Sequence, residues 1–166
     1  MKQEQKTETA TFAEGCFWGV EDLFSKVSGV VKTEVGYTGG KKEYPNPSYE
    51  LVCTGKTGHA EAINITFNPM QVSYEKLLDL FWQSHNPTTK DMQGPDIGSQ
   101  YRSAIFYHNE EQKKAAEKSK KEYQKRFAKP IVTEISQAGP FYRAEEYHQQ
   151  YVKKTGRGAC HFVPNR

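Results

Sequence analysis

Apolar and polar residues form short blocks along the chain, and their period changes repeatedly between that of a strand and that of a helix. Alternation at every second residue is typical of a half-buried strand, and apolar residues three and four apart are typical of a helix packed along one face. We expect strands over 9–14, 30–37, 60–67, 103–107 and 131–136, and helices over 16–26, 74–82 and 109–127. This order predicts an α/β (α+β) two-layer sandwich with one mixed sheet and helices packed on it.

Short polar residues precede two of the predicted helices. Ser73 stands before the helix over 74–82, and Asn109 before the helix over 109–127. Such side chains accept a hydrogen bond from an amide of the first helical turn. Gln112, three residues after Asn109, resembles the second half of a capping box.

Two long loops and a weakly patterned tail complete the chain. Residues 39–58 and 86–100 are rich in Gly, Pro and polar side chains, and long ordered loops in compact domains usually carry function. After residue 139 only 144–151 suggests a helical turn, and no repeat or linker divides the chain. We therefore predict a single domain over 1–166 with an irregular C-terminal tail from about residue 139.

Composition indicates a folded protein that works in a reducing compartment. Of 166 residues, 36% are hydrophobic and 13% aromatic, which excludes a disordered chain. No apolar run approaches the roughly 20 residues that span a bilayer, and residues 1–6 lack the apolar stretch of a secretory signal. We expect a cytoplasmic protein, where three cysteines indicate thiol chemistry or an inert thiol rather than a disulfide framework.

Cys16 is the strongest candidate for chemistry, because it follows Gly15 where a strand turns into a helix. The amides and the positive dipole end at a helix start favour the thiolate, and such thiols have pKa values of about 3.5 to 7.5 instead of about 8.5. Phe17 and Trp18 act against this, since apolar surroundings disfavour charge. We expect the two effects to cancel in part, and the alternative is a small buried thiol without a reaction.

Two candidate acids lie at the start of the strand over 60–67. Glu61 enters an apolar strand, an environment that would raise the pKa of its carboxyl and make it an acid. The alternative is a solvated carboxylate at a strand edge. His59 is the second candidate acid or base, or else a turn residue with both ring nitrogens satisfied.

A polar group over 96–103 lies where the second long loop meets a strand. It includes Asp96, Gln100, Tyr101 and Arg102. Loop residues mounted on a rigid element commonly bind ligands. A hydrogen-bonded turn is the alternative.

The other two cysteines have different surroundings. Cys160 lies among glycines near the end of the chain, so we expect it to be mobile, accessible and suited to attack a sulfenic acid as a resolving thiol. Cys53 follows the apolar pair Leu51 and Val52, and we expect it to be buried and inert.

Metal and nucleic-acid sites have little support. No cysteines or histidines stand at the spacings of zinc ligands, so we expect no metal. Eight Lys or Arg residues fall within 113–129, but four Glu residues accompany them and the net charge is only +3. A solvated helix of mixed charge explains this run better than nucleic-acid binding does.

The sequence resembles peptide methionine sulfoxide reductase of the A type, in motifs that extend over nearly the whole chain. The matching segments are 15–21 (GCFWGVE), 36–40 (GYTGG), 46–50 (NPSYE), 57–61 (TGHAE), 81–82 (FW) with 85–88 (HNPT), 93–94 (QG) with 96–103 (DIGSQYRS), and 147–151 (YHQQY). They occur in family order, which makes an accidental match very improbable.

The resemblance implies reduction of methionine-S-sulfoxide, free or in proteins, on a sandwich with a split βαβ, ferredoxin-like core. It assigns Cys16 as nucleophile, Glu61 as acid, and Tyr49 and Tyr101 as donors to the sulfoxide oxygen. For the substrate it implies walls of Phe17 and Trp18 around the methyl group and a polar anchor at Asp96. It also implies a resolving role for Cys160, with no cofactor beyond an external thiol reductant, thioredoxin or dithiothreitol.

One departure from the family pattern concerns the tail. Some members have two recycling cysteines there, whereas here only Cys160 follows the last predicted helix, which predicts a one-step relay from Cys16. Whether Cys160 reaches Cys16 directly, and whether Cys53 takes part, stays open. We expect a monomer without nucleic-acid or membrane partners. A thiol peroxidase would use the same cysteines but needs a cation to bind peroxide, and no Arg lies near Cys16 in sequence.

Overall fold

The computed structural model describes residues 6–157, so the predictions for Cys160 lie outside the described residues. The strands are β1 (Glu8–Glu14), β2 (Val30–Thr38), β3 (Ala60–Phe67), β4 (Met92–Gln93), β5 (Asp96–Ile97), β6 (Ser103–Tyr107), β7 (Glu134–Gln137) and β8 (Tyr142–Arg143). The helices are α1 (Phe17–Ser25), α2 (Tyr49–Cys53), α3 (Tyr74–Gln83), α4 (Glu110–Gln124) and α5 (Tyr151–Thr155), with 3-10 turns η1 (Ser99–Tyr101) and η2 (Glu146–His148).

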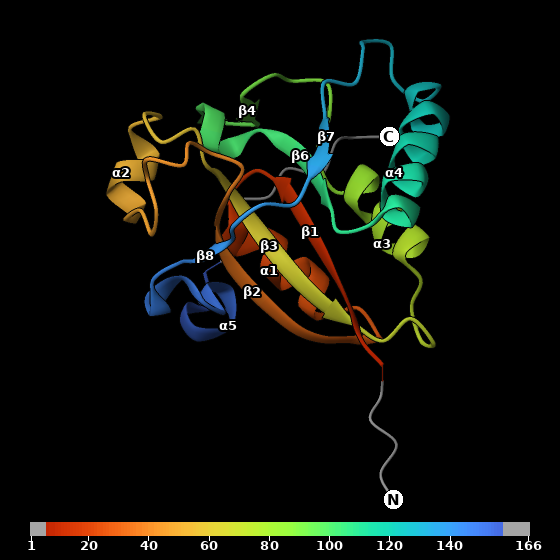
Figure 1. Cartoon of the computed structure of the whole chain (residues 1–166), viewed down its shortest axis with the longest axis horizontal. Coiled ribbons are helices and arrows are strands. Elements are labelled where there is room, and N and C mark those ends of the chain that lie inside the picture. The colour runs from red at the N-terminus through yellow and green to blue at the C-terminus, as the bar shows by residue number, and fades with distance from the viewer. Residues whose placement is uncertain (1–5, 158–166) are drawn as a thin grey trace, which may run out of the picture.

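Six strands form one mixed sheet in the order β7-β6-β1-β3-β2-β8 (Figure 1). β3 is antiparallel to both β1 and β2, and β6 is antiparallel to β1 and parallel to β7. β1 and β2 therefore run in the same direction with β3 between them, and α1 connects them. The predicted sandwich with a mixed sheet and a split βαβ core is confirmed.

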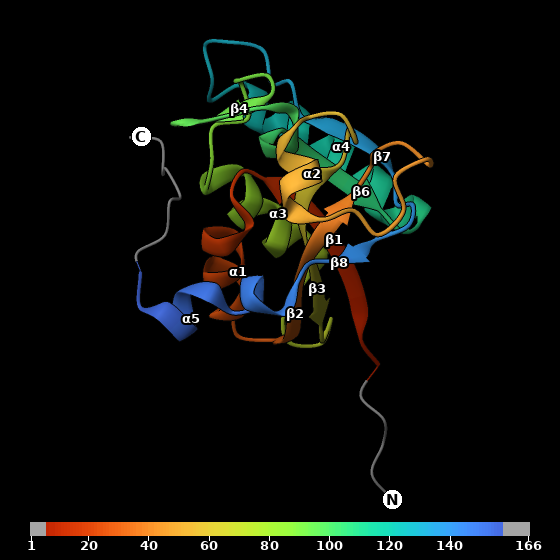
Figure 2. The ribbon, with the colours of Figure 1, turned by 90° about the vertical axis from the view of Figure 1, so that its left-hand side faces the viewer.

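Helices α1 and α3 cover one face of this sheet (Figure 2). The core beneath them is aromatic: the Phe12 ring on β1 lies 5.7 Å from Phe24 of α1 and 5.1 Å from Phe81 of α3, and all three are fully buried. Each buried ring contributes about 1.5–3 kcal/mol of stability. Alternation along β3 places Glu61 on the same face as Ile63 and Ile65, so its side chain points toward α1.

Small residues on the opposite face allow the chain to pass close over the sheet. Alanines of β1, β3 and β6 pack there against Ala138 and Phe141. At Gly36 a Cβ atom would lie 2.4 Å from the carbonyl oxygen of Tyr142. Any other residue would therefore push β8 away from the sheet.

The C-terminal segment returns from β8 to the start of α1. The Gln149 side chain accepts from the Val35 amide at 3.0 Å and donates to the Val35 carbonyl at 2.9 Å, as a paired strand residue would. Glu145 accepts from the Tyr37 hydroxyl at 3.0 Å and from the Tyr49 amide at 3.1 Å. These side chains fasten residues 144–150 to β2 and α2.

The sequence patterns located most elements and missed the shortest. Ser73 and Asn109 begin α3 and α4 as predicted, each accepting from the amide three residues later. The 39–58 loop contains the five-residue helix α2, and the 86–100 loop contains the paired strands β4 and β5. Within the described part of the chain, no helix is long and apolar enough to cross a bilayer.

Two boundaries differ from the prediction. α4 ends at Gln124 rather than near residue 127, because the Gln124 side chain bonds the Lys129 carbonyl and the Ile131 amide and turns the chain away. β7 begins at Glu134 rather than 131, since the Val132 amide bonds the Pro87 carbonyl instead of a strand.

Candidate active site

Cys16 lies between the end of β1 and the first turn of α1, as the sequence predicted. Gly15 has φ +108°, a conformation that other residues rarely adopt, and a Cβ there would lie 2.9 Å from the Gln93 side chain. Cys16 is the N-cap of α1, its carbonyl accepts from the Val20 amide at 3.5 Å, and it is partly exposed. The thiol is therefore accessible, at a helix end that stabilises negative charge.

A buried cluster holds the end of β1 that precedes this turn. The carboxylate of Glu14 accepts from the Ser84 hydroxyl at 2.6 Å and lies 3.1 Å from Nδ1 of His85. His85 also contacts the Phe81 carbonyl at 2.6 Å and the Ser103 hydroxyl at 2.7 Å. These contacts connect β1 to the end of α3 and to β6. Glu14 and His85 are both fully buried.

Glu61, on β3, lies beside the first turn of α1 and is only 1% exposed. Its Oε1 accepts from the Phe17 amide at 3.3 Å, whereas its Oε2 has no hydrogen-bond partner among residues 6–157. Burial raises the pKa of this carboxyl to about 8, the Phe17 amide lowers it, and the nearby charge of Asp96 adds to the rise. Glu61 therefore carries a proton at neutral pH, unlike the solvated carboxylate considered as the alternative.

Tyr49 and Tyr101 come from the two long loops and face the same carboxyl. Tyr49 begins α2 and Tyr101 ends η1, and both are partly buried. The pKa of each hydroxyl is raised, first by burial and then by the charge of Glu61. Both hydroxyls therefore stay protonated and remain hydrogen-bond donors, and that of Tyr49 is hydrogen-bonded to the Cys53 thiol. Asp96, on β5, acts electrostatically on Tyr101 and Glu61.

The two aromatic residues after Cys16 differ in exposure: Phe17 is buried, whereas Trp18 is partly exposed and is held in place by His148. The Trp18 indole N–H donates to Nδ1 of His148 at 2.9 Å, and its ring stacks on Tyr151 at 3.9 Å between centroids. The His148 ring also packs against two other rings, with 5.2 Å between its centroid and that of Phe17 and 4.6 Å between its centroid and that of Tyr49. The 147–151 motif is one of those that carry the resemblance, but the sequence alone indicated no role for His148 or Tyr151.

Of the two alternatives for His59, an acid or base and a turn residue with both ring nitrogens satisfied, the structure shows the second. Its Nδ1 accepts from the Gly40 amide at 3.0 Å, and its Nε2 lies 2.9 Å from the Tyr44 carbonyl. Both ring nitrogens are thus engaged in shaping the first long loop. Of the two candidate acids, Glu61 therefore remains, bonded to the residue after Cys16.

Arg102 also supports loops. Its guanidinium donates to the carbonyls of Gly58 at 2.9 Å, Ser99 at 3.0 Å and Gly39 at 3.3 Å. These bonds hold the two long loops against each other. Tyr49 and Tyr101 stand on those loops, and Glu61 acts electrostatically on both hydroxyls.

The expectation that Cys53 is buried is wrong. Cys53 ends α2 with its side chain exposed, while Val52 points inward and is fully buried. A helix this short turns only one side chain in two or three toward the core. Although the residue is exposed, partial burial of its thiol raises the thiol pKa, the hydrogen bond with Tyr49 lowers it, and the charge of Glu61 adds a smaller rise.

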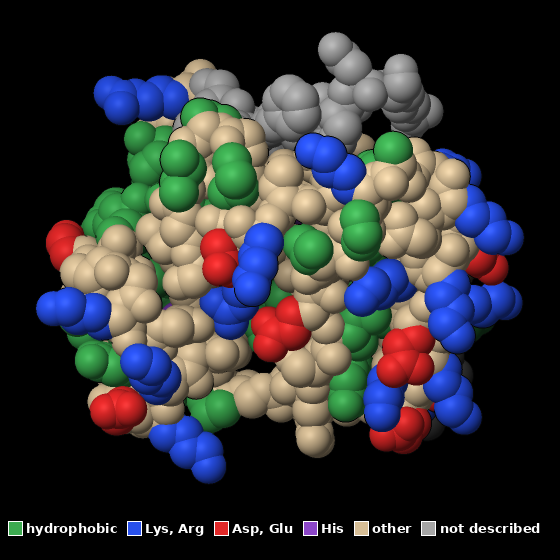
Figure 3. All heavy atoms as spheres, turned by 90° about the horizontal axis from the view of Figure 1, so that it is seen from above, with side chains coloured by type: hydrophobic (Ala, Val, Ile, Leu, Met, Phe, Trp, Pro, Cys, Tyr) green, Lys and Arg blue, Asp and Glu red, His purple; other side chains and the backbone are tan. Residues whose placement is uncertain are grey.

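The basic run on α4 mixes with acidic residues. Its last turns carry Lys118, Lys121 and Lys125 beside Glu117 and Glu122, and Figure 3 shows blue and red side chains adjoining on that side. This fits a solvated helix face. In the described part of the chain, no group of three or more His, Cys, Asp or Glu residues could hold a metal ion.

The comparisons with known proteins agree with this geometry. The family model of peptide methionine sulfoxide reductase matches residues 8–166. The peptide methionine sulfoxide reductase MsrA of Methanothermobacter thermautotrophicus is 58% identical over 158 residues, which cover 94% of this chain and 92% of the relative.

Solved structures give the same result. Reduced Mxr1 from Saccharomyces cerevisiae has a TM-score of 0.91 at 38% identity, covering 99% of this chain and 96% of that chain. Mxr1 in complex with Trx2 has a TM-score of 0.65 at 26% identity, with the same coverage. Fold, site and relatives together define the class of protein, an oxidoreductase. The chain belongs to the peptide methionine sulfoxide reductase family, A type.

Proposed function

We propose that this enzyme reduces the S epimer of methionine sulfoxide, free or in oxidised proteins, through attack of Cys16 on the sulfoxide sulfur. The observation that supports this most directly is the carboxyl of Glu61. It is bound through Oε1 to the residue after Cys16, has no partner on Oε2 among the described residues, and has a pKa of about 8.

The chemistry needs such an acid. A sulfoxide sulfur accepts a thiolate only if its oxygen leaves as a protonated group, because the bare oxygen is a poor leaving group. Glu61 would give its proton to that oxygen, and the Tyr49 and Tyr101 hydroxyls would donate hydrogen bonds to it. With a second proton the oxygen leaves as water, and the Cys16 and methionine sulfurs are joined as a sulfonium. Water then attacks the Cys16 sulfur, the S–S bond breaks, methionine departs with its electron pair, and Cys16 becomes a sulfenic acid.

Selection between epimers follows from two contacts that act together. Phe17 and Trp18 offer an aromatic surface for the methyl group, while the donors fix the oxygen, and Asp96 would anchor a polar part of the substrate. In the other epimer the methyl and oxygen exchange places. Each group would then meet the wrong partner, leaving buried donors unpaired.

The second half of the cycle uses Cys160 and an external reductant. The Cys160 thiol would attack the sulfenic sulfur of Cys16, releasing water and forming a disulfide, which thioredoxin reduces by exchange. The similarity to Mxr1 in its complex with Trx2 supports thioredoxin as this partner. We also propose that the enzyme is a monomer and acts in the cytoplasm, where its thiols can be recycled.

Mass spectrometry of the enzyme after one turnover tests this proposal. One equivalent of methionine-S-sulfoxide should yield a Cys16–Cys160 disulfide, with Cys53 still free. Cys160→Ser should complete one turnover, stall with thioredoxin and leave Cys16 oxidised. A Cys16→Ser enzyme that still reduced the sulfoxide would refute the role of Cys16, and undiminished turnover of Cys160→Ser with thioredoxin would refute the relay.

A further inference from the structure

Glu21 is a buried carboxylate to which the proposed reaction gives no part. It lies on α1 three residues after Trp18, on the same side of the helix, and is 1% exposed. Its Oε1 accepts from the Gln150 backbone amide at 2.6 Å. Its Oε2 accepts from the Gln150 side chain at 2.9 Å and from the Thr33 hydroxyl at 2.9 Å. One carboxylate thus joins α1 and β2 to the C-terminal segment.

The residue that Glu21 binds has an unusual backbone. Gln150 has φ +55° and ψ +36°, in the left-handed region that residues other than glycine rarely adopt. It stands immediately before α5, so this conformation sets the direction in which α5 begins. Such a conformation persists only where surrounding contacts enforce it. The two bonds from Gln150 to Glu21 are contacts of that kind.

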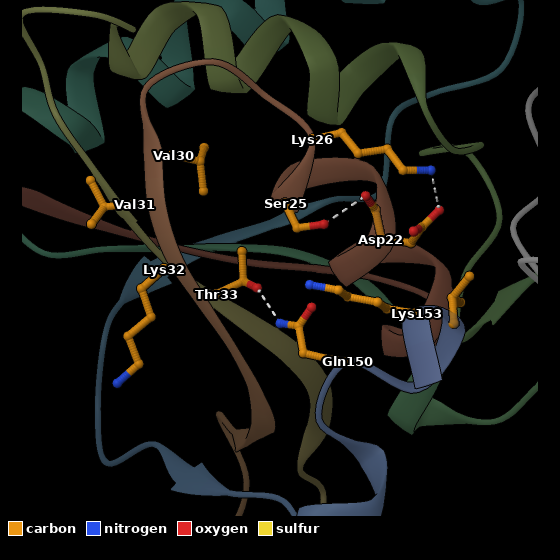
Figure 4. Close-up of a pocket in the computed structure, with 10 residues that line it drawn as sticks. Asp22, Ser25, Lys26, Val30, Val31, Lys32, Thr33, Gln150 and Lys153 are labelled. Carbon is orange, nitrogen blue, oxygen red and sulfur yellow. Dashed lines mark hydrogen bonds and ion pairs between the residues drawn. The ribbon is translucent and has the colours of Figure 1, made fainter. Parts of the chain in front are cut away.

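The outer side of this segment is open. A hollow of about 740 Å³ lies between the end of α1, the start of β2 and α5, and Gln150, Val152 and Lys153 border it. Figure 4 shows the Gln150 side chain directed to Thr33 at the edge of this hollow, with their 3.1 Å hydrogen bond dashed. Packing from the solvent side therefore does little to hold Gln150.

Tyr151, the residue after Gln150, contacts Trp18 of the candidate active site. Tyr151 stacks on the Trp18 ring with an interplanar angle of 13° and 3.9 Å between centroids. Trp18, Glu21, Gln150 and Tyr151 border one small cavity of about 10 Å³, so they are near neighbours. Glu21 is therefore linked to Trp18 indirectly: it binds Gln150, Gln150 precedes Tyr151 in the chain, and the Tyr151 ring stacks on the indole.

We propose that Glu21 is a positioning residue for substrate binding: it holds Gln150 in its left-handed conformation and thereby fixes Tyr151 against Trp18. The inference rests on the proposed function, in which Trp18 receives the substrate methyl group. Glu21 touches neither substrate nor thiol. It therefore acts on the affinity for the sulfoxide, not on proton transfer or on the attack by Cys16.

Glu21→Gln is the variant that tests this. It keeps the size of the side chain but places an amide NH₂ where Gln150 or Thr33 offers a donor, so one of the bonds is lost. Incorporated 5-fluorotryptophan gives one ¹⁹F resonance each for Trp18 and Trp82, assigned with Trp18→Phe. We expect the Trp18 resonance to shift or broaden while that of Trp82 stays in place. The KM for N-acetylmethionine-S-sulfoxide should rise about tenfold with kcat within about twofold.

Glu34→Gln is the matched control, because Glu34 also binds the C-terminal segment, through a partly exposed contact with Arg143 at 3.1 Å. It should change neither the Trp18 resonance nor KM. If Glu21→Gln does not fold, Tyr151→Leu removes the last link and should reproduce both changes.

Either of two results overturns the inference: an unmoved Trp18 resonance in folded Glu21→Gln, or a moved resonance with an unchanged KM. Failure of the proposed function is seen separately, in an active Cys16→Ser enzyme or in a Trp18→Ala enzyme with the KM of wild type.

Discussion

The backbone amide of Phe17 donates to Oε1 of Glu61 at 3.3 Å. The residue after Cys16, the proposed nucleophile, therefore fixes the position of Glu61, the proposed acid, although Phe17 and Glu61 stand 44 residues apart in sequence. Burial keeps that carboxyl protonated at neutral pH. Thiol and acid are thus held by adjacent residues of one turn, and a substrate oxygen between them would meet a proton as its sulfur meets the thiolate.

Glu61→Gln should lower kcat far more than it changes KM. General acids contribute about 10²- to 10⁴-fold to rate, and an amide of equal size keeps the bond to Phe17 without a proton to give. Steady-state kinetics with a peptide sulfoxide measures this, and exposed Glu117→Gln on α4 is the control. A rise in KM as large as the fall in kcat, or a fall in kcat of less than about tenfold, would mean that Glu61 only shapes the site.

The buried Glu61 should also make stability depend on pH in a defined direction. Its pKa is raised in the folded state, so between about pH 4.5 and 8 the folded protein holds a proton that the unfolded chain releases. This contribution is fully present below that window and falls by about 1.4 kcal/mol per pH unit through it. Urea unfolding of wild type and Glu61→Gln at pH 5 to 8 should therefore show wild type losing stability relative to the variant. A constant difference would contradict the raised pKa.

Trp18→Ala should raise the KM for methionine-S-sulfoxide about 10- to 100-fold, because it removes the aromatic ring that we propose contacts the methyl group. Trp18→Phe keeps a ring and loses the indole bond to His148, so its effect should be smaller. The core Trp82, bonded to Ser119 at 2.9 Å, supplies the control: Trp82→Phe should lower the melting temperature and leave KM unchanged. A KM insensitive to Trp18→Ala would remove Trp18 from the binding surface.

His85→Ala should destabilise the fold by about 3 kcal/mol, from a cavity and from the loss of a partner of buried Glu14. Lys26→Ala removes an exposed contact with Asp22 on α1 and should cost about 0.5 kcal/mol or less. Chemical denaturation of both variants gives the comparison. Equal effects of the two substitutions would show that the buried cluster does not secure β1.

Local patterns predicted the long elements because each presents an apolar face to one core. The stripe from Tyr74 to Trp82 and its Ser73 cap identified α3 in this way. Helix α2 gave no such signal, since five residues make little more than one turn and bury only Val52. Its position depends instead on the bond from the Tyr49 amide to Glu145, far away in the chain.

The site was predictable only where chemistry is local. Gly15 and Cys16 stand at a strand-to-helix turn, and that setting alone indicated a reactive thiol. Spacing could not show that Tyr49 and Tyr101 meet at Glu61, because Arg102 joins their loops through backbone carbonyls. Nor could it show that His148 orients Trp18 from 130 residues away.

The pH dependence of a single turnover tests the pairing of Cys16 with Glu61 most directly. Rapid mixing of reduced enzyme with methionine-S-sulfoxide between pH 6 and 10 gives the rate at which Cys16 is oxidised. Because Glu61 carries its proton only below a pKa of about 8, the wild-type rate should fall above that pH, and the slow rate of Glu61→Gln should show no such fall. A wild-type rate that rises steadily to pH 10 as more thiolate forms would contradict the account.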